Sequence, residues 1–225
     1  MIASDIQVRW LGTVPYRDAL AVQLETHRAV VEHRSPDTLL LLQHPPVYTL
    51  GKRGDQGGFL LTREEIGRRG AEIVATDRGG LLTFHGPGQL VGYPILALDE
   101  RHLSLRCYVD VLMQALARVL KSFGVDAAVD ASRPGVYVQG RKIASVGVRL
   151  SEGVTRHGFA VNLTTDLSWF DAIVPCGLHG VKATSLQAET GTSPTPEKFG
   201  RAAAAELEAG LRQKQGKRSE TSCRT

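Results

Sequence analysis

Three short runs of strand-forming residues, at 135–138, 142–150 and 154–163, follow one another and constrain the fold more than any other feature. The connections between them, Gln139-Gly140-Arg141 and Ser151-Glu152-Gly153, are short and contain glycine, as β-hairpins require. Strands that are joined by hairpins run antiparallel. The sequence therefore predicts an antiparallel meander in this part of the chain.

Helix and strand signals alternate irregularly along the rest of the chain. Further strands are predicted at residues 38–43, 47–50, 73–76, 81–85 and 90–96, and helices at residues 15–34, 62–70, 104–123 and 195–213. This order has neither a regular βαβ period nor an internal repeat, which disfavours a doubly wound parallel sheet. We expect an α+β fold with a mixed, largely antiparallel sheet flanked by helices.

The net charge of the chain comes from its last residues. There are 27 Lys and Arg against 23 Asp and Glu, a net charge of +4. Residues 212–225 hold five of the basic residues and only Glu220 as an acid, so the body is neutral. A chain without net charge outside its last residues gives no support for a nucleic-acid partner. We expect a single catalytic domain over residues 1–211 and a basic, disordered tail over residues 212–225.

The N-terminus and the cysteines predict a cytoplasmic protein without a disulfide framework. The first ten residues lack the basic and apolar regions of a secretory signal, and no apolar run approaches the roughly 18 residues of a membrane span. The three cysteines, Cys107, Cys176 and Cys223, are scattered and form no CxxC pair. No cluster of His, Cys and Asp has the spacing of a zinc site.

The most unusual segment is Arg78-Gly-Gly-Leu-Leu-Thr-Phe-His-Gly-Pro-Gly-Gln89, between two predicted strands. A plain hairpin would need only one of its glycines. Glycine allows positive φ angles and close approach of another molecule to the backbone, and Pro87 stiffens the turn after His85. The segment therefore predicts contact with a ligand. It is not a P-loop, and the Gly51-Lys52 pair lacks the flanking residues of one.

Cys176 stands between Pro175 and Gly177, after the apolar pair Ile173-Val174. A cysteine after an apolar run is usually a small buried side chain. Here the flanking proline and glycine indicate a turn, where a thiol can be exposed and backbone N–H groups can point at a developing oxyanion. Cys107 in a predicted helix and Cys223 in the tail have no such setting. Cys176 is thus the candidate nucleophile.

Lys142 precedes the small and apolar residues 143–148. Such a lysine ordinarily extends its amine to solvent. An amine that is held among apolar groups instead has a lowered pKa, and it can act as a base or pair with a thiolate. His157 belongs to the next predicted strand, so the hairpin brings its strand beside that of Lys142. A lone histidine is more often structural, and the roles of His85 and His157 stay open.

Four motifs follow one another: segment 78–89, Gly140-Arg-Lys-Ile-Ala-Ser-Val-Gly147, His157-Gly-Phe-Ala-Val-Asn-Leu163 and Val174-Pro-Cys-Gly177. Together with the upstream His44-Pro-Pro-Val-Tyr-Thr-Leu-Gly51, they resemble the lipoyl(octanoyl) transferase family over residues 8–186. This family is similar in fold to the catalytic domain of biotin and lipoate protein ligases. The resemblance implies a mixed sheet flanked by helices.

The resemblance also implies transfer of an octanoyl group from acyl carrier protein to a lysine ε-amine, in the first step of endogenous lipoate synthesis. By motif, Cys176 is the nucleophile and Lys142 its activating partner, while His44 and His157 are supporting residues. The residues expected to contact the acyl substrate are Arg78, Gly79, Gly80, Leu81, Leu82, Thr83, Phe84, His85, Ser145, Val146, Gly147, Gly158, Phe159 and Ala160.

The implied partners are octanoyl-acyl carrier protein as donor and, as acceptors, the lipoyl domains of 2-oxoacid dehydrogenase E2 subunits and the glycine-cleavage H protein. A thioester donor is already activated, so we expect no cofactor, and we expect a monomer that binds neither nucleic acid nor membrane. Two alternatives stay open. One is an ATP-dependent lipoate or biotin ligase, since the Gly-rich residues 51–58 faintly resemble a nucleotide loop. The other is a non-catalytic protein that binds lipoyl domains.

Overall fold

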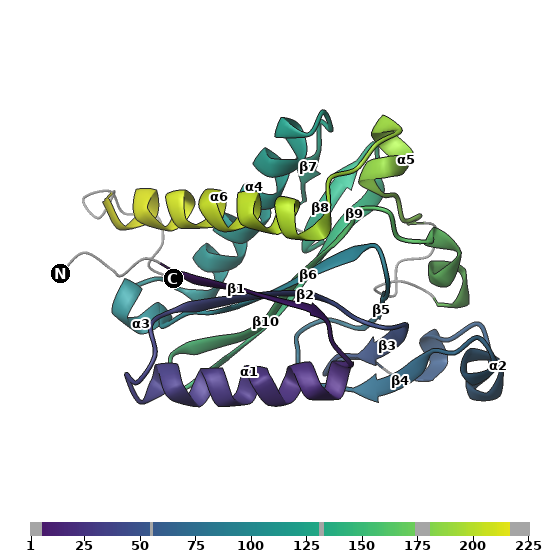
Figure 1. Ribbon diagram of the computed structural model, residues 1–225, viewed down its shortest axis with the longest axis horizontal. Helices are drawn as coiled ribbons and strands as arrows, with labels where there is room; N and C mark the ends of the chain where they lie inside the picture. Colours follow the sequence, from purple (N-terminus) through teal and green to yellow (C-terminus); the bar gives the residue numbers. More distant parts are fainter. Residues whose placement is uncertain (1–5, 55, 131–132, 174–180, 217–225) are drawn as a thin grey trace.

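The computed structural model describes residues 6–54, 56–130, 133–173 and 181–216 (Figure 1). In chain order the elements are β1 (Gln7–Thr13), α1 (Tyr16–Val31), β2 (Thr38–Gln43), β3 (Val47–Leu50), η1 (Gln56–Gly58), α2 (Arg63–Arg68), β4 (Glu72–Ala75), β5 (Leu82–His85), β6 (Gln89–Ile95), α3 (Leu98–Arg101), α4 (Leu105–Ser122), β7 (Ala128–Val129), β8 (Gly135–Val138), β9 (Arg141–Ser151), β10 (Val154–Asn162), η2 (Leu167–Ala172), α5 (Leu186–Thr190) and α6 (Pro196–Gly216).

The strands of the described ranges form two sheets. The large sheet has seven strands in the order β1-β2-β6-β10-β9-β8-β7, and the small sheet has three in the order β4-β3-β5. β1 runs parallel to β2 and β4 parallel to β3, whereas the other neighbours are antiparallel. The predicted α+β class with a mixed, largely antiparallel sheet is confirmed, and the predicted meander corresponds to β8, β9 and β10.

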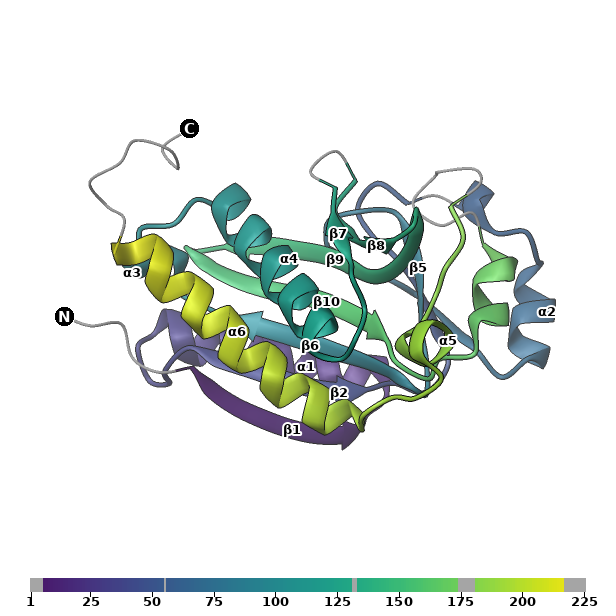
Figure 2. The same cartoon turned by 90° about the horizontal axis from the view of Figure 1, so that it is seen from above.

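Helices cover both faces of the large sheet, with α4 and α6 on one face and α1 on the other (Figures 1 and 2). β2 shows why its sequence is continuously aliphatic. Leu39 and Leu41 belong to the core beneath α4 and α6, whereas Leu40 and Leu42 belong to the core beneath α1. Successive side chains of a strand point to opposite faces, so a strand between two helical layers is apolar on both sides.

Local signals set several helix ends. The Thr62 hydroxyl accepts the Glu65 N–H, and the Glu65 carboxylate accepts the Thr62 N–H, so a capping box begins α2. The Thr195 hydroxyl accepts the Lys198 N–H at 3.3 Å, so α6 begins where the Thr-Pro pair predicts. Helix α4 ends at Ser122, before Gly124, which has a φ of +88° that favours glycine.

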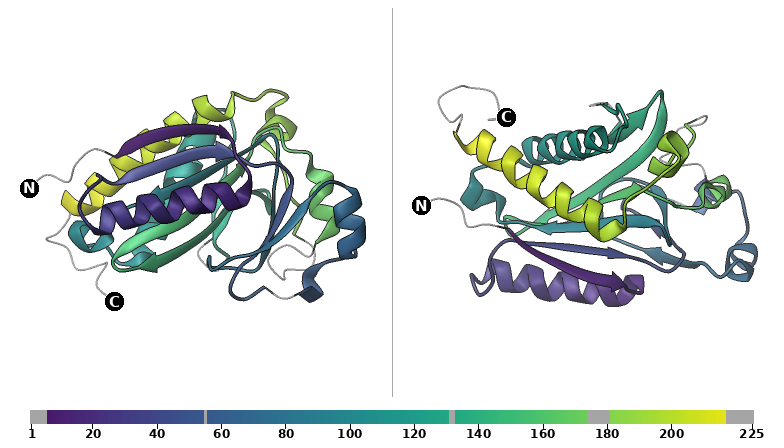
Figure 3. Two further views of the ribbon diagram at one scale, coloured as in Figure 1. Left: turned by 60° about the horizontal axis from the view of Figure 1, so that its bottom comes forward. Right: turned by 45° about the horizontal axis from the view of Figure 1, so that its top comes forward.

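The small sheet and α2 lie at the end of the molecule away from α3 (Figures 1 and 3). Their core is aromatic. The Phe84 ring stacks on Trp169 of η2 with 5.0 Å between ring centroids, and the Tyr48 hydroxyl donates to the Trp169 carbonyl at 2.7 Å. These contacts attach η2 to the small sheet, so the chain just before residue 174 is held at this end of the molecule.

Three differences from the sequence predictions concern the ends of the chain and of α1. β1 was not predicted, because its parallel partner β2 follows only after the whole of α1. Helix α1 ends at Val31 rather than at residue 34. Residues 212–216, which we placed in the tail, continue α6, and Arg212 pairs with Glu208 at 3.0 Å. None of the helices in the described part of the chain is long and apolar enough to cross a membrane.

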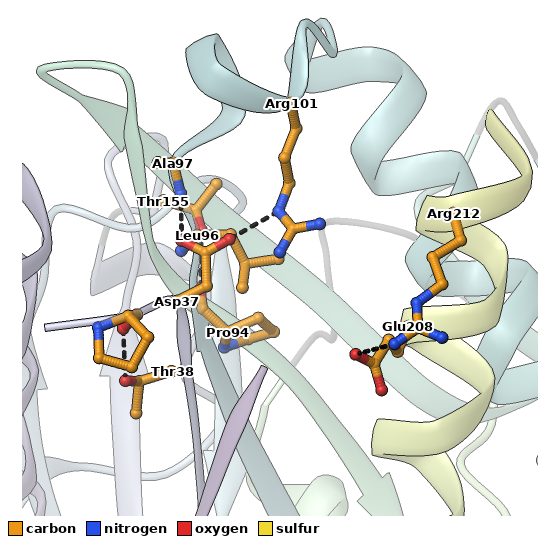
Figure 4. Close-up of polar contacts among 10 residues, drawn as sticks. Asp37, Thr38, Pro94, Leu96, Ala97, Arg101, Thr155, Glu208 and Arg212 are labelled. Atoms are coloured by element: carbon orange, nitrogen blue, oxygen red, sulfur yellow. Dashed lines mark hydrogen bonds and ion pairs between the residues drawn. The ribbon is translucent and has the colours of Figure 1, made fainter. Parts of the chain in front are cut away.

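A buried ion pair lies just before the start of β2. Asp37 Oδ2 accepts a hydrogen bond from Arg101 Nε at 2.6 Å, and its Oδ1 accepts the Ala97 N–H at 2.8 Å (Figure 4). Nearby, the Thr155 hydroxyl of β10 donates to the Pro94 carbonyl of β6 at 2.7 Å. These bonds tie the start of β2 to α3 and the end of β6 to β10.

Replacement of Asp37 tests how much this ion pair contributes to the stability of the fold. The side chains of Arg101 and Asp37 are only 4% and 9% exposed, so Asp37→Ala leaves a buried guanidinium without its carboxylate. We expect the free energy of unfolding, measured by urea denaturation, to fall by about 3–5 kcal/mol. The control is Glu208→Ala, which removes the exposed pair with Arg212 in Figure 4 and should change stability by less than about 1 kcal/mol. Equal losses in the two variants would contradict the interpretation.

Candidate active site

One pocket lies where the loop before β5 meets β9 and β10. It contains about 520 Å³ of space, part of which is open solvent. Of the residues expected to contact an acyl group, those that line it are Arg78, Gly80, Leu81, Leu82, Thr83, His85, Ser145, Val146, Gly147, Gly158, Phe159 and Ala160. Lys142 and His157 line it too. The structure thus brings segments from three motifs to one cavity.

The loop and the sheet meet by direct backbone contact. The Gly79 N–H donates to the Val148 carbonyl of β9 at 3.0 Å. A Cβ at Gly147 would lie 2.8 Å from the Gly79 carbonyl oxygen, which is closer than real Cβ contacts. Glycine at residue 147 is therefore required by this close approach, and the loop and β9 form adjacent walls of the pocket.

Arg78 holds the loop in shape. Its guanidinium donates to the Thr49 carbonyl at 2.6 Å, to the Thr49 hydroxyl at 2.9 and 3.1 Å, to the Leu81 carbonyl at 2.8 Å and to the Gly79 carbonyl at 3.0 Å. The rigid fork of arginine suits this set of acceptors, whereas lysine offers a single ammonium group. The cation thus organises the loop and also lines the pocket.

Three of the expected residues do not line the pocket. Gly79 contributes its backbone to the contact with β9. Phe84 points into the aromatic core of the small sheet. His44 lies behind the pocket wall, where its Nε2 is 2.7 Å from the hydroxyl of Tyr93. Alternation along β5 explains Phe84, since its neighbours Thr83 and His85 line the pocket.

Lys142 lies near the start of β9 and is linked to the chain that follows residue 180. Its N–H donates to the Lys182 carbonyl at 2.8 Å, and its carbonyl accepts the Thr184 N–H at 2.9 Å. The Lys142 Nζ is 5.6 Å from the centroid of the Tyr137 ring, in the range of a cation–π contact. Lys142 is therefore a residue of the pocket wall, and its amine lies beside an aromatic face.

The cysteines are only partly described. Cys176 belongs to residues 174–180, which lie outside the described part of the chain, as does Cys223. Cys107 is buried in α4, as the amphipathic pattern of that helix indicates. The described chain on either side of Cys176 is attached at two places: Ile173 pairs with Phe59 and Ala183 with Lys142.

Two buried histidines lie side by side next to the pocket. His44 Nδ1 donates to the Val14 carbonyl at 2.7 Å, and its Nε2 accepts from the Tyr93 hydroxyl. Burial lowers the pKa of His44 to about 4. Burial, with a smaller effect of the neighbouring His44, lowers the pKa of His85 to about 3. Both imidazoles are therefore neutral near pH 7.

His157 lies at the other end of the hairpin from Lys142. It pairs with Val148 in β9, while Val161 pairs with Ala144. Its Nε2 is 2.7 Å from Oδ1 of Asp77, which also binds Arg156 at 2.7 Å. Burial raises the pKa of Asp77, but the hydrogen bonds from His157 and Arg156 outweigh burial and lower it to about 2. Burial lowers the pKa of His157.

Sequence reasoning missed Tyr16, Val91 and Tyr93, which also line the pocket. Val91 and Tyr93 alternate along β6, so their common face could have been predicted, but the location of that face depends on the pairing of β6 with β10. Tyr16 stands at the start of α1, and its ring stacks on that of His85 with 6.3 Å between centroids. No local pattern in the sequence links Tyr16 to His85.

Comparisons with known proteins define the class. The profile of the lipoyl protein ligase A/B catalytic domain matches residues 15–208. An octanoyltransferase of Mycobacterium leprae is 47% identical over 196 residues, which cover 84% of this chain and 81% of the relative. A lipoate-protein ligase A bound with ATP aligns with a TM-score of 0.71 at 13% identity, over 98% of each chain. Biotin protein ligase from Aquifex aeolicus in complex with biotin and ATP aligns with a TM-score of 0.57 at 16% identity, over 94% of this chain and 72% of that chain.

The chain belongs to the lipoyl protein ligase A/B catalytic domain family. Within this family it is an acyltransferase of lipoate biosynthesis, since curated octanoyltransferases are 40–47% identical to it over most of its length. The solved ligases, at much lower identity, confirm the predicted ligase-like fold.

The neutral histidines predict how stability depends on pH. The unfolded chain protonates histidine below about pH 6.5, whereas folded His44 stays neutral down to about pH 4. Between these values the unfolded state binds more protons, so the free energy of unfolding falls as the pH falls. We expect His44 to account for roughly 2 kcal/mol of the loss between pH 7 and pH 5, measured by urea denaturation at both values.

His44→Gln should therefore lose roughly 2 kcal/mol less than the unchanged protein between pH 7 and pH 5. The control is His33→Gln, at a histidine whose side chain is 77% exposed. Comparing each variant with itself at the two pH values removes any constant change in stability. If His44→Gln loses as much stability as the unchanged protein, His44 is not a buried neutral group.

Proposed function

We propose that the enzyme transfers an octanoyl group from octanoyl-acyl carrier protein to a lysine ε-amine of a lipoyl domain, through a thioester on Cys176. One observation carries the proposal: a single pocket gathers Lys142, the loop from Arg78 to His85 and segments of β9 and β10, in a chain whose relatives are octanoyltransferases. Its lining includes apolar residues, among them Leu81, Val91 and Ala160, against which an eight-carbon chain can be buried. Such burial contributes about 0.8 kcal/mol per methylene group.

In the first step the Cys176 thiolate attacks the carbonyl carbon of the donor thioester. A new C–S bond forms, the C–S bond to the carrier protein breaks, and the Lys142 ammonium gives a proton to the departing thiolate. Free cysteine is only a few per cent thiolate at neutral pH, and a neighbouring cation stabilises that form. The Tyr137 ring near the Lys142 Nζ supports the charged state of the amine.

In the second step the acceptor amine attacks the octanoyl thioester. The C–N bond of the amide forms, the C–S bond to Cys176 breaks, and Lys142 takes the proton that the amine nitrogen loses. The thiolate and ammonium are then restored. Exchange between thioesters is nearly balanced in free energy, and conversion of a thioester to an amide is downhill, so neither step requires ATP.

The chain path supports the pairing of Cys176 with Lys142. Ala183, seven residues after Cys176, forms a bridge with Lys142, and two backbone hydrogen bonds flank this bridge. Ile173, three residues before Cys176, forms a bridge with Phe59 in the small sheet. The segment that carries the nucleophile therefore starts and ends at attached positions, one of them at Lys142 itself.

The acceptors of this family's reaction are lipoyl domains. We propose that the specific acceptors are the E2 subunits of 2-oxoacid dehydrogenases and the glycine-cleavage H protein. The donor is octanoyl-acyl carrier protein. We further propose that the reaction takes place in the cytoplasm, where reducing conditions keep the thiol of Cys176 free. We also propose that the enzyme is a monomer.

The Cys176 thioester is tested by intact mass. Incubation with octanoyl-acyl carrier protein, without acceptor and without ATP, should raise the mass of the enzyme by one octanoyl group. Cys176→Ser should show no thioester adduct. Cys107→Ser, at a buried cysteine of α4, is the matched control and should keep the adduct.

Two results would overturn this mechanism. One is an unchanged mass in enzyme that transfers octanoyl groups to a lipoyl domain. The other is an absolute requirement for ATP, which would support the ligase chemistry of the structural neighbours instead. Turnover in Cys176→Ser that equals that of Cys107→Ser would remove the nucleophile assignment as well.

Lys142→Ala tests the activating partner. Loss of a positioned acid and base should lower turnover by about 100-fold or more and change the pH profile of the rate. Lys121→Ala, at an exposed lysine of α4, is the control and should keep both the rate and the profile. If Lys142→Ala also keeps both while circular dichroism shows a folded protein, the assignment of Lys142 is wrong.

A further inference from the structure

Behind the pocket a chain of hydrogen bonds connects segment 78–89, the motif at 157–163 and the chain after residue 180. Asn162 Nδ2 donates to the Thr184 carbonyl at 2.9 Å, and Gln89 Nε2 donates to Asn162 Oδ1 at 2.9 Å. Gln89 Nε2 also lies 3.2 Å from the Phe84 carbonyl. At the pocket end, Gln89 Oε1 lies 2.7 Å from His85 Nδ1. The last residue of β10, the first residue of β6 and the last residue of β5 are thus joined in one network.

Backbone carbonyls set the direction of every bond in this network. A carbonyl oxygen only accepts, so Thr184 requires the NH₂ group of Asn162, and Phe84 requires the NH₂ group of Gln89. Each amide then presents its oxygen to the next residue. Because Gln89 Oε1 can only accept as well, His85 Nδ1 carries the proton and donates it. A neutral His85 consequently has a bare nitrogen at Nε2.

We propose that this network positions His85 as a hydrogen-bond acceptor for the ε-amine of the acceptor lysine, with Nε2 as the accepting atom. The inference rests on the transfer reaction proposed above and names a specific contact within it. Asn162 and Gln89 are positioning residues that act through His85.

The surroundings of His85 support an acceptor rather than a proton carrier. The side chain is buried and lines the pocket, and its ring lies beside the rings of Tyr16 and His44, at 6.3 and 5.8 Å between centroids. Burial lowers the pKa of His85 to about 3, so Nε2 holds almost no proton near pH 7. A base this weak makes a poor general base, but its lone pair still accepts a hydrogen bond.

The nature of the two substrates indicates which group His85 binds. Nε2 has no hydrogen-bond partner among the described residues, and a bare ring nitrogen repels an oxyanion or a carbonyl oxygen. The octanoyl thioester has oxygen but no N–H or O–H at its reacting centre, whereas the incoming amine has N–H groups. A hydrogen bond from the amine to His85 would leave its nitrogen lone pair free for attack on the thioester carbon.

The tautomer can be observed without any assay of activity. In the unchanged enzyme, the ¹⁵N signals of the two ring nitrogens should show a protonated Nδ1 and a bare Nε2 for His85, assigned by their loss in His85→Phe. Gln89→Met keeps a similar volume and removes the acceptor, so the protonated nitrogen should change to Nε2. His44, whose Nδ1 donates to the Val14 carbonyl, is the internal control and should keep its tautomer in both proteins.

The two half-reactions then test the contact with the amine. Formation of octanoyl-enzyme from the carrier protein should proceed at the same rate in Gln89→Met as in the unchanged enzyme. Single-turnover transfer from octanoyl-enzyme to a lipoyl domain should slow by about 10-fold, the order expected for loss of one positioned hydrogen bond. If Gln89→Met does not fold, His85→Phe takes its place in the transfer assay, where it should slow transfer from preformed octanoyl-enzyme.

Two results would overturn the inference: a protonated Nε2 in the unchanged enzyme, or equal slowing of both half-reactions in Gln89→Met. Failure of the underlying reaction is a different result, because the unchanged enzyme would then form no octanoyl-enzyme at all. In that case the ¹⁵N spectrum still decides whether the network sets the tautomer of His85.

Discussion

The hydrogen bond from the Gly79 N–H to the Val148 carbonyl joins the loop before β5 to the large sheet, and the shape of the pocket depends on this contact. The bond requires that Gly147 carry no side chain, because a Cβ there would meet the Gly79 carbonyl. From the other side, Arg78 binds Thr49 in the small sheet and the carbonyls of its own loop. Two sheets with separate cores thereby share one cavity, and the glycines of the motif follow from this close backbone contact.

The interior of this cavity is arranged to keep imidazoles neutral and directed. His44 is oriented by the Val14 carbonyl and His85 by Gln89, whose own direction follows from the Phe84 carbonyl. Burial disfavours a charge on either ring. Fixed main-chain carbonyls thus determine where protons sit beside the pocket. Such an environment suits a reaction between an acyl chain and an uncharged amine.

Much of the fold could be predicted because its signals are local. The hairpins of β8, β9 and β10 follow from short turns, and the starts of α2 and α6 follow from their capping residues. β1 could not be predicted in this way, because it pairs with β2 across the whole of α1. Local sequence patterns do not predict pairing between segments that are this far apart in the chain.

The residues of the site also divide into those that the sequence predicts and those that only the tertiary structure brings there. Glycines, His85 and Lys142 stand out by residue type and context, and a resemblance to a family supplies their proposed roles. Asp77, which holds His157, and Tyr16, which stacks on His85, come to the site only through tertiary contacts. His157 has a φ of +56° within β10, a conformation that a strand pattern does not predict.

The account centres on an octanoyl chain that is attached to Cys176 and lies in the pocket between the loop from Gly80 to His85 and β9. The most direct measurement is a crystal structure of the enzyme after reaction with octanoyl-acyl carrier protein and removal of the carrier. The account predicts continuous density from the Cys176 sulfur into this pocket, beside Val146 and Gly147. Density for the chain on another residue, or in another part of the molecule, would contradict it.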